Sequence, residues 1–280
     1  MSETVKRPRG RPRAAEPERG GGVQSLERAL GLMTALARLD SATLSDLALR
    51  TGTPPSTAHR LLTTLQASRY VAYDQATNLW TVGVEAFRTG SSFLRQTRVV
   101  EAARDVMREL VEQTGETANV AVPDGGEVVF VSQVETSHPI RAFFGPGARA
   151  HMHASGIGKA LLAAMGRAEV ERRLQKVGLP EFTPNTLASP AALFADLEHI
   201  RARGWSLDDE ERNLGMRCVA AAIHNAHGEA VAGVSISGPC ARLPHERLAE
   251  VGPMVRRAAA RITERIGGVA PEDVRPTATG

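Results

Sequence analysis

Residues 43–65, TLSDLALRTGTPPSTAHRLLTTL, carry the signals of two short helices joined by a tight turn. Thr43 followed three positions later by Asp46 is a capping-box arrangement, and Gly52 can end the helix that it starts. Thr53 can cap a second helix with Pro54 at its first position, where the missing N–H costs nothing. This order of signals predicts a helix-turn-helix.

The polar face of the second of these helices is the candidate DNA reader. It presents Ser56, Thr57, His59, Arg60, Thr63 and Thr64. An arginine there can donate two hydrogen bonds to guanine or bind phosphate, and hydroxyls suit phosphate oxygens and base edges. The alternative is an ordinary solvated helix face.

The flanking segments extend the prediction to a winged helix over residues 23–83. Val23, Leu26, Leu30 and Met33 are spaced as one stripe of a first helix. After the helix-turn-helix, two short apolar runs at residues 70–73 and 79–82 enclose a polar turn, which predicts a β-hairpin.

Charge is concentrated at the amino-terminal end. The chain has 34 basic and 31 acidic residues, and residues 1–22 hold six of the basic and three of the acidic ones, so this arm accounts for the whole net charge of +3. Around Arg9 and Arg11 it reads RGRP and resembles an AT-hook, which enters the minor groove of A·T-rich DNA. A solubilising tail is the other interpretation.

The rest of the 280 residues is long enough for a second domain. A linker helix is expected over residues 84–98, an α+β domain with an antiparallel sheet over 99–268, and a flexible tail over 269–280. The expected helices cover residues 99–115, with Gly115 as the end, 155–165, 169–177, 191–203 and 243–266, and the expected strands 118–122, 128–134, 140–144, 219–223 and 230–237.

Several motifs resemble the IclR family of bacterial transcriptional regulators. They read VQSLERAL at 23–30, TAHRLL at 57–62, MHASGIGKA at 152–160, LDDEE at 207–211, GMRCVAA at 215–221 and VSISGP at 234–239. The resemblance implies a GAF-like effector-binding domain, is nearest to the acetate-operon repressor branch, and implies a small oxo-acid such as glyoxylate or pyruvate as the ligand. Pro55 departs from the lysine that many members carry.

The resemblance also assigns effector-binding residues. These are the backbone N–H groups of Gly156 and Ile157, the side chains of Asp208, Cys218, Ser235 and Ser237, and Met216 as a wall. A capped helix start at Ser155 would leave amides free for a carboxylate, and two serines two positions apart on a strand face one side. The alternatives are ordinary buried hydroxyls, a small buried cysteine, and an aromatic-pathway acid such as protocatechuate or homogentisate as the ligand.

An enzyme that uses Cys218 as nucleophile is the rival class, but no histidine lies in a recognisable partner motif. The pair His151 and His153 offers only two ligands, so we expect neither a metal nor a cofactor. Two cysteines and no apolar run of about 20 residues favour a cytoplasmic protein without a membrane span. The expected partners are a palindromic operator in double-stranded DNA and further copies of the chain, as a homodimer or homotetramer. The target operon and the sign of regulation stay open.

Overall fold

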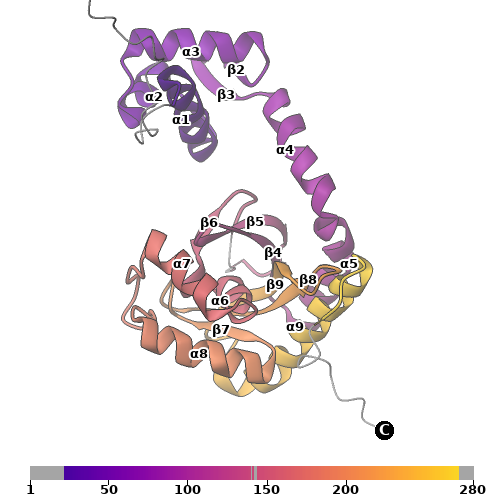
Figure 1. Cartoon of the computed structure of the whole chain (residues 1–280). Coiled ribbons are helices and arrows are strands. Elements are labelled where there is room, and N and C mark those ends of the chain that lie inside the picture. The colour runs from indigo at the N-terminus through magenta and orange to yellow at the C-terminus, as the bar shows by residue number, and fades with distance from the viewer. Residues whose placement is uncertain (1–21, 140, 142–143, 271–280) are drawn as a thin grey trace, which may run out of the picture. The chain divides into compact units, whose positions relative to one another are not determined.

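The computed structural model describes residues 22–139, 141 and 144–270. The chain divides into two compact units, and the division falls between Phe93 and Leu94. Helix α4 (Val84–Thr97) crosses this division and corresponds to the expected linker helix (Figure 1).

In residues 22–93, three helices and a three-stranded antiparallel sheet form a winged helix-turn-helix. The elements are α1 (Gln24–Leu39), β1 (Ser41–Ala42), α2 (Leu44–Thr51), α3 (Pro55–Ala67), β2 (Val71–Asp74) and β3 (Leu79–Val82). Strand β3 pairs with both β1 and β2, so the predicted hairpin forms and β1 ties it to the helices.

The turn between α2 and α3 is built largely as the sequence predicts. Thr43 Oγ1 accepts a hydrogen bond from the Asp46 N–H at 3.2 Å, the Asp46 carboxylate accepts from the Thr43 N–H, and Gly52 ends α2 with a φ of 61°. The predicted start of α3 is wrong by one residue. Pro54 is the N-cap and Pro55 takes the first helical position, while Thr53 is buried and contacts the Thr51 hydroxyl.

Only Met33 of the four residues named for the apolar stripe of α1 packs against the core. Leu32 and Leu36 are fully buried in the core of the unit, whereas Val23, Leu26 and Leu30 are each more than half exposed. The first two turns of α1 therefore present an apolar surface to solvent.

Replacing Thr43 with Ala should lower the free energy of unfolding of this unit by about 1 kcal/mol, because α2 loses its side-chain cap. Urea unfolding followed by the fluorescence of the buried Trp80 measures it, in a Trp205→Phe background because the chain has two tryptophans. Thr34→Ala removes a hydroxyl from an exposed position inside α1 and should change the value by less than about 0.5 kcal/mol. Equal losses in both variants would contradict a capping role for Thr43.

Within the described part of residues 94–270, six strands form one antiparallel sheet in the order β6-β5-β4-β9-β8-β7. The strands are β4 (Thr117–Asp124), β5 (Glu127–Val134), β6 (Arg149–His151), β7 (Ser206–Asp209), β8 (Met216–His224) and β9 (Ala230–Pro239). The helices are α5 (Val99–Thr114), the short 3-10 helix η1 (Met152–Ala154), α6 (Gly156–Ala163), α7 (Arg167–Val177), α8 (Pro190–Arg203) and α9 (His245–Arg265). No helix of the described residues is long and apolar enough to cross a membrane.

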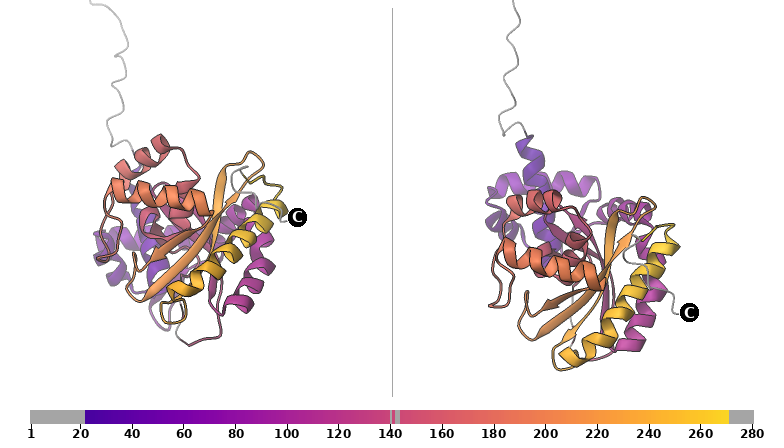
Figure 2. Two further views of the ribbon diagram at one scale, coloured as in Figure 1. Left: turned by 90° about the horizontal axis from the view of Figure 1, so that it is seen from below. Right: turned by 60° about the horizontal axis from the view of Figure 1, so that its bottom comes forward.

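Helices cover both faces of this sheet (Figure 2). On one face, α5 and α9 pack on residues such as Val219 and Ile236, and on the other, α6 and α8 pack on residues such as Phe130 and Ala220. Neighbouring residues along β8 and β9 alternate between these faces, as the pleat of a strand requires. The predicted α+β class is confirmed.

One expected strand is not seen where the structure describes it, and one strand forms that was not expected. Residues 140, 142 and 143 of the expected strand 140–144 lie outside the described residues, and Arg141 and Phe144 belong to no strand; the neighbours of β5 are β4 and β6. Strand β7 was not expected at all, because a four-residue run that ends in two aspartates has little strand propensity by itself. Pairing with β8 overrides that propensity.

Candidate ligand site and nucleic-acid interface

Helix α3 turns its predicted reading face outward. Ala58 and Leu62 are buried in the core of the unit, which fixes the rotation of the helix. Five of the six predicted residues are exposed, namely Ser56, His59, Arg60, Thr63 and Thr64, and Thr57 is half-buried. Gln66 also belongs to this face, although it was not predicted: it is exposed one helical turn beyond Thr63 and offers a donor and an acceptor.

Hydrogen-bonding capacity remains on this face. The hydroxyls of Thr63 and Thr64 donate to the carbonyls of His59 and Arg60 at 2.9 Å and keep their lone pairs as acceptors. Arg60 has no ion-pair partner among the described residues, so its guanidinium is available to phosphate or guanine.

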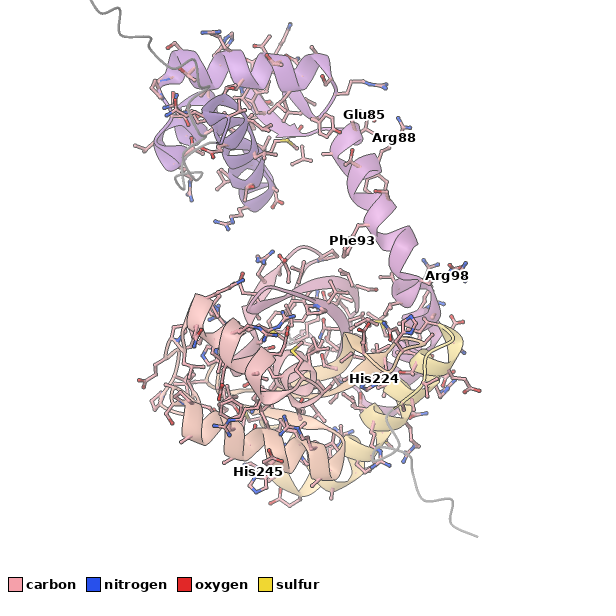
Figure 3. All side chains as sticks on the ribbon, viewed as in Figure 1. Glu85, Arg88, Phe93, Arg98, His224 and His245 are labelled. Carbon is pink, nitrogen blue, oxygen red and sulfur yellow. The ribbon has the colours of Figure 1, made fainter. Side chains whose placement is uncertain are left out.

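Outside α3, few described residues of this unit are free to contact DNA. The turn of the β2–β3 hairpin, residues 74–78, contains no cation, and Asp74 is occupied by the Ala76 N–H and the Thr77 hydroxyl. Glu85 pairs with Arg69 and Arg88, which holds both guanidiniums at the start of α4; Figure 3 marks Glu85 and Arg88. The predicted minor-groove residues Arg9 and Arg11 lie outside the described residues.

In the second unit, polar side chains form two rows across the sheet face that α6 covers. Strand register places Asp208, Cys218, Ser237 and Thr117 side by side in one row, and Ser206, Ala220, Ser235, Asn119 and Gln133 in the next. The hydroxyl and amide residues of β4, β7 and β9 in these rows are at most 2% exposed. Four predicted residues from three strands are therefore brought together: Asp208, Cys218, Ser235 and Ser237.

The first turn of α6 lies directly on these rows. The Ser155 hydroxyl caps the helix by accepting from the Gly158 N–H at 2.9 Å, and Ser206 donates to the Gly156 carbonyl at 2.6 Å. A Cβ on Gly156 would lie 2.7 Å from Cys218 Sγ, and one on Gly158 would lie 2.3 Å from the Met152 backbone, so neither glycine can be replaced without movement.

Unused donors converge at this contact. The N–H groups of Gly156 and Ile157 belong to the first helical turn, where no intrahelical acceptor exists. The Ser235 hydroxyl is fully buried and has no hydrogen-bond partner in the described part of the chain, whereas Asn119 donates to the Ser237 hydroxyl at 3.4 Å. A buried polar group without a partner is rare, and here it lies beside a helix start that favours anions.

Met216 lies at the edge of the same face. It is two residues before Cys218 on β8, is half-buried, and opposes Pro239 of β9. Its side chain therefore shares the face of Cys218 one step toward the strand end.

The Cys218 thiol is not set up as a nucleophile. Burial raises its pKa to about 11, the nearby Asp208 carboxylate raises it further, and the Ser237 and Ser235 hydroxyls and the Gly156 N–H, which can donate to the thiolate form, offset only part of this. Reactive cysteines need the opposite change, because the thiolate is the attacking form.

A buried ionic cluster borders the rows, and sequence reasoning missed it. Lys159 is 1% exposed, and its Nζ lies 2.7 Å from Asp196 Oδ2 and 2.5 Å from Glu211 Oε1. Asp208 accepts the Glu211 N–H at 2.8 Å, and Glu211 Oε2 has no partner among the described residues. The signal was present as a single lysine in the apolar helix GIGKALLA, since a buried lysine requires an acidic partner.

Burial controls the protonation of the carboxyls in this cluster. It raises the pKa of Asp208 to about 6, against the opposing effects of the Glu211 and Arg212 N–H groups and of Lys159. Burial also raises the pKa of Glu211, although Lys159 acts in the other direction. Asp208 thus faces Cys218 as a group that changes charge near neutral pH.

The histidine pair does not form a metal centre with other residues. The rings of His151 and His153 are 5.8 Å apart, and His153 Nε2 lies 3.0 Å from the Pro180 carbonyl. Among the described residues, no group of three or more His, Cys, Asp or Glu side chains is placed to hold a metal ion.

A winged helix with an open reading face and a second domain with buried, unsatisfied donors define a ligand-responsive DNA-binding regulator. The model of the IclR helix-turn-helix domain matches residues 25–75, and that of the bacterial transcriptional regulator IclR C-terminal domain matches residues 91–264. The chain belongs to the IclR family of transcriptional regulators.

The chain matches named regulators over nearly the whole length of both proteins. The chain is 48% identical to the HTH-type transcriptional regulator BhcR of Paracoccus denitrificans, covering 90% of this chain and 91% of that protein. It is 41% identical to the acetate operon repressor of Salmonella typhimurium, covering 96% and 99%. An IclR homolog from Microbacterium hydrocarbonoxydans, complexed with 4-hydroxybenzoate, shares the fold with a TM-score of 0.76 at 23% identity, covering 86% and 98%. These relatives show a regulator and not an enzyme.

Asp208 should make the stability of this unit depend on pH. Its folded pKa is raised, so its stabilising contribution is complete below its unfolded value near 3.8 and is lost as the pH rises through about 6. At about 1.36 kcal/mol per pKa unit, the ionised carboxylate costs the folded state about 3 kcal/mol.

Urea unfolding at pH 5 and pH 8 measures this dependence through the fluorescence of Trp205, in a Trp80→Phe background because the chain has two tryptophans. The free energy of unfolding should fall less between the two pH values in Asp208→Asn than in the wild type. Asp105→Asn, which changes an exposed carboxylate on α5, should behave like the wild type. A wild-type pH dependence in Asp208→Asn would exclude Asp208 as its source.

Proposed function

We propose that this regulator controls a metabolic operon and that a small oxo-acid such as glyoxylate or pyruvate changes its affinity for DNA. The observation that carries the proposal is the fully buried Ser235 hydroxyl, which has no partner in the described residues and lies beside the first turn of α6. A bound ligand would supply the missing partner. All groups of this site belong to the second unit, so the ligand can bind whether or not DNA is bound.

The surrounding groups suit a small carboxylate. The amides of Gly156 and Ile157 would receive the carboxylate, and the hydroxyls of Ser235 and Ser237 the oxo group. Asp208 would accept from a hydrated aldehyde. All of these donors are neutral, and the nearby cation, Lys159, is already paired with Asp196 and Glu211. Neutral donors give the moderate, reversible affinity that a sensor needs.

The size of the site favours a small ligand over an aromatic acid. Cys218, Ala220 and the first turn of α6 are in close contact, which leaves little space on the inner side of the rows. The name of the Salmonella relative, acetate operon repressor, agrees with a small metabolite. The 4-hydroxybenzoate complex of the Microbacterium homolog keeps an aromatic acid such as protocatechuate or homogentisate as the second candidate.

DNA binding is proposed to require at least two copies of the chain. Residues 22–93 carry six arginines and five carboxylates, a net charge of only +1, which is too little for strong binding by one winged helix. The exposed stripe of Val23, Leu26 and Leu30, together with the 72% exposed Phe87 of α4, offers an apolar surface for a second copy. A homodimer would bind a palindromic operator, and a homotetramer two of them.

The arm would add to this affinity. Arg9 and Arg11 are proposed to enter the minor groove beside the site that α3 contacts, as the AT-hook-like sequence suggests. The oxo-acid would then act by favouring one conformation or assembly over another, since a ligand shifts an equilibrium by its difference in affinity for the two states.

Arg60→Ala should weaken binding to DNA by at least about fivefold, because a bidentate arginine contact contributes about 1–3 kcal/mol. The DNA is a site selected with the wild-type protein from a pool of random duplexes, and it should be two-fold symmetric. Affinity is measured by mobility shift at one fixed salt concentration. Arg38→Ala removes the same charge from the end of α1 and should have a small effect. Unchanged affinity in Arg60→Ala would remove α3 as the reader.

Ser235→Ala combined with Ser237→Ala should abolish the effect of glyoxylate and pyruvate on DNA binding and leave binding without ligand intact. Calorimetry with glyoxylate, pyruvate and protocatechuate identifies the ligand in the wild type, and the double variant should lose most of that binding. A ligand response of normal size in the double variant would exclude these serines. Binding of protocatechuate alone would favour the aromatic alternative.

A further inference from the structure

The outer edge of β8 is only partly covered. Strand β7 pairs with β8 from Arg217 to Ala220, and beyond Ala220 the strand continues to His224 with no neighbour on that side among the described residues. Alternate residues of such an edge direct their N–H and C=O groups outward. The uncovered stretch therefore offers backbone hydrogen-bonding groups.

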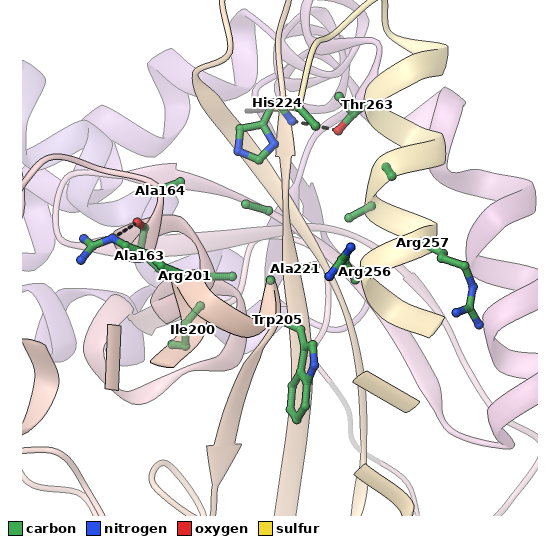
Figure 4. Close-up of a pocket in the computed structure, with 16 residues that line it drawn as sticks. Ala163, Ala164, Ile200, Arg201, Trp205, Ala221, His224, Arg256, Arg257 and Thr263 are labelled. Carbon is green, nitrogen blue, oxygen red and sulfur yellow. Dashed lines mark hydrogen bonds between the residues drawn. The ribbon is translucent and has the colours of Figure 1, made fainter. Parts of the chain in front are cut away.

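A cavity of about 420 Å³ lies at this edge, between α6, α8 and α9 (Figure 4). Its volume is within the range of roughly 300–1,000 Å³ that is usual for small-molecule sites. The walls are mostly apolar and consist largely of alanines, which leave the space open: Ala160, Ala163 and Ala164 of α6, Ala221 and Ala222 of β8, and Ala259 and Ala260 of α9. Ile200 and Trp205 supply the larger apolar surfaces.

One wall carries a buried imidazole without a partner. His224 is 5% exposed, its backbone N–H donates to Thr263 Oγ1 at 3.0 Å, and its ring forms no hydrogen bond within the described residues. Burial lowers the pKa of His224, so the ring is neutral at pH 7 and offers one donor and one acceptor. Figure 4 shows the ring extending from β8 among the lining residues. A ligand in the cavity could hydrogen-bond to a ring nitrogen of His224.

The charges around the cavity are positive. Its charged lining residues are Arg201, Arg256 and Arg257, with no Asp or Glu. Arg201 is bound by the Ala163 carbonyl and pairs with Glu198, whereas Arg256 and Arg257 have no ion-pair partner in the described part of the chain. Arg257 extends away from the cavity in Figure 4, so Arg256 is the guanidinium without an ion-pair partner that an anion in the cavity can reach.

We propose that this cavity is a second ligand site and that it binds a monocarboxylate with an apolar body. The apolar body packs on the alanines, and the carboxylate is bound by Arg256, whose side chain lies on the Trp205 side of the cavity (Figure 4). None of its lining residues belongs to the rows around Ser235, so the two sites are separate, although α6 and β8 contribute to both.

The test uses octanoate as the probe and the full chain with Trp80→Phe, which leaves Trp205 as the only tryptophan. Equilibrium dialysis with labelled octanoate should show one saturable site per chain, and binding should change the fluorescence of Trp205. Octylamine has a similar apolar body and the opposite charge, and it should bind at least about tenfold more weakly. No saturable binding at millimolar octanoate, or equal binding of the amine, would overturn the proposal.

Two pairs of variants locate the probe. Ala260→Phe on α9 and Ala164→Phe at the end of α6 replace exposed lining residues on different walls, so the fold should tolerate them. Each should weaken octanoate binding at least tenfold, whereas Ala260→Ser and Ala164→Ser, which add no such bulk, should bind normally. The variant with Ser235→Ala and Ser237→Ala should also bind octanoate normally. Full affinity in both phenylalanine variants, or a loss in the serine double variant, would place the probe elsewhere and refute the second site.

Discussion

The close approach of the first turn of α6 to β8 is the constraint on which the ligand-binding domain depends. It requires glycine at 156 and at 158, because a Cβ at either position would overlap Cys218 or the Met152 backbone. It also requires small residues beneath the helix, which Cys218 and Ala220 provide. The result is a helix start with free N–H groups against a buried row of hydroxyls, a place where an anion can be held without a lysine or arginine.

The buried charges near the proposed ligand site are paired with one another. Lys159 lies one turn further along α6 and is held by Asp196 and Glu211. Desolvation of such a cluster is costly, and it raises the pKa of Asp208 to about 6. The electrostatic potential that a ligand meets at the site therefore depends on how many of these carboxyls are protonated.

The winged-helix unit combines a low net charge with an exposed apolar surface. Its reading face is small, its hairpin turn has no cation, and its net charge in the described residues is +1. The exposed apolar residues of α1 and Phe87 of α4 are therefore as informative as the polar ones of α3. Exposed apolar residues mark a surface that binds another protein, here the proposed second copy of the chain. Two linked copies bind two half-sites of DNA at once, which raises the affinity of a weak single contact.

The sequence alone determined the features that depend on near neighbours: the cap at Thr43, the turn at Gly52, the wing, the outward face of α3 and the capped start of α6. It also contained the residues of the proposed ligand site, through motifs that resemble the family. Only the tertiary structure decided that Asp208, Cys218 and Ser237 stand side by side, that Lys159 pairs with a carboxyl 52 residues away, that β7 forms and that β8 extends past it. Caps and turns are fixed by contacts over three or four residues, whereas strand register and buried ion pairs arise from segments that meet only when the whole domain is packed.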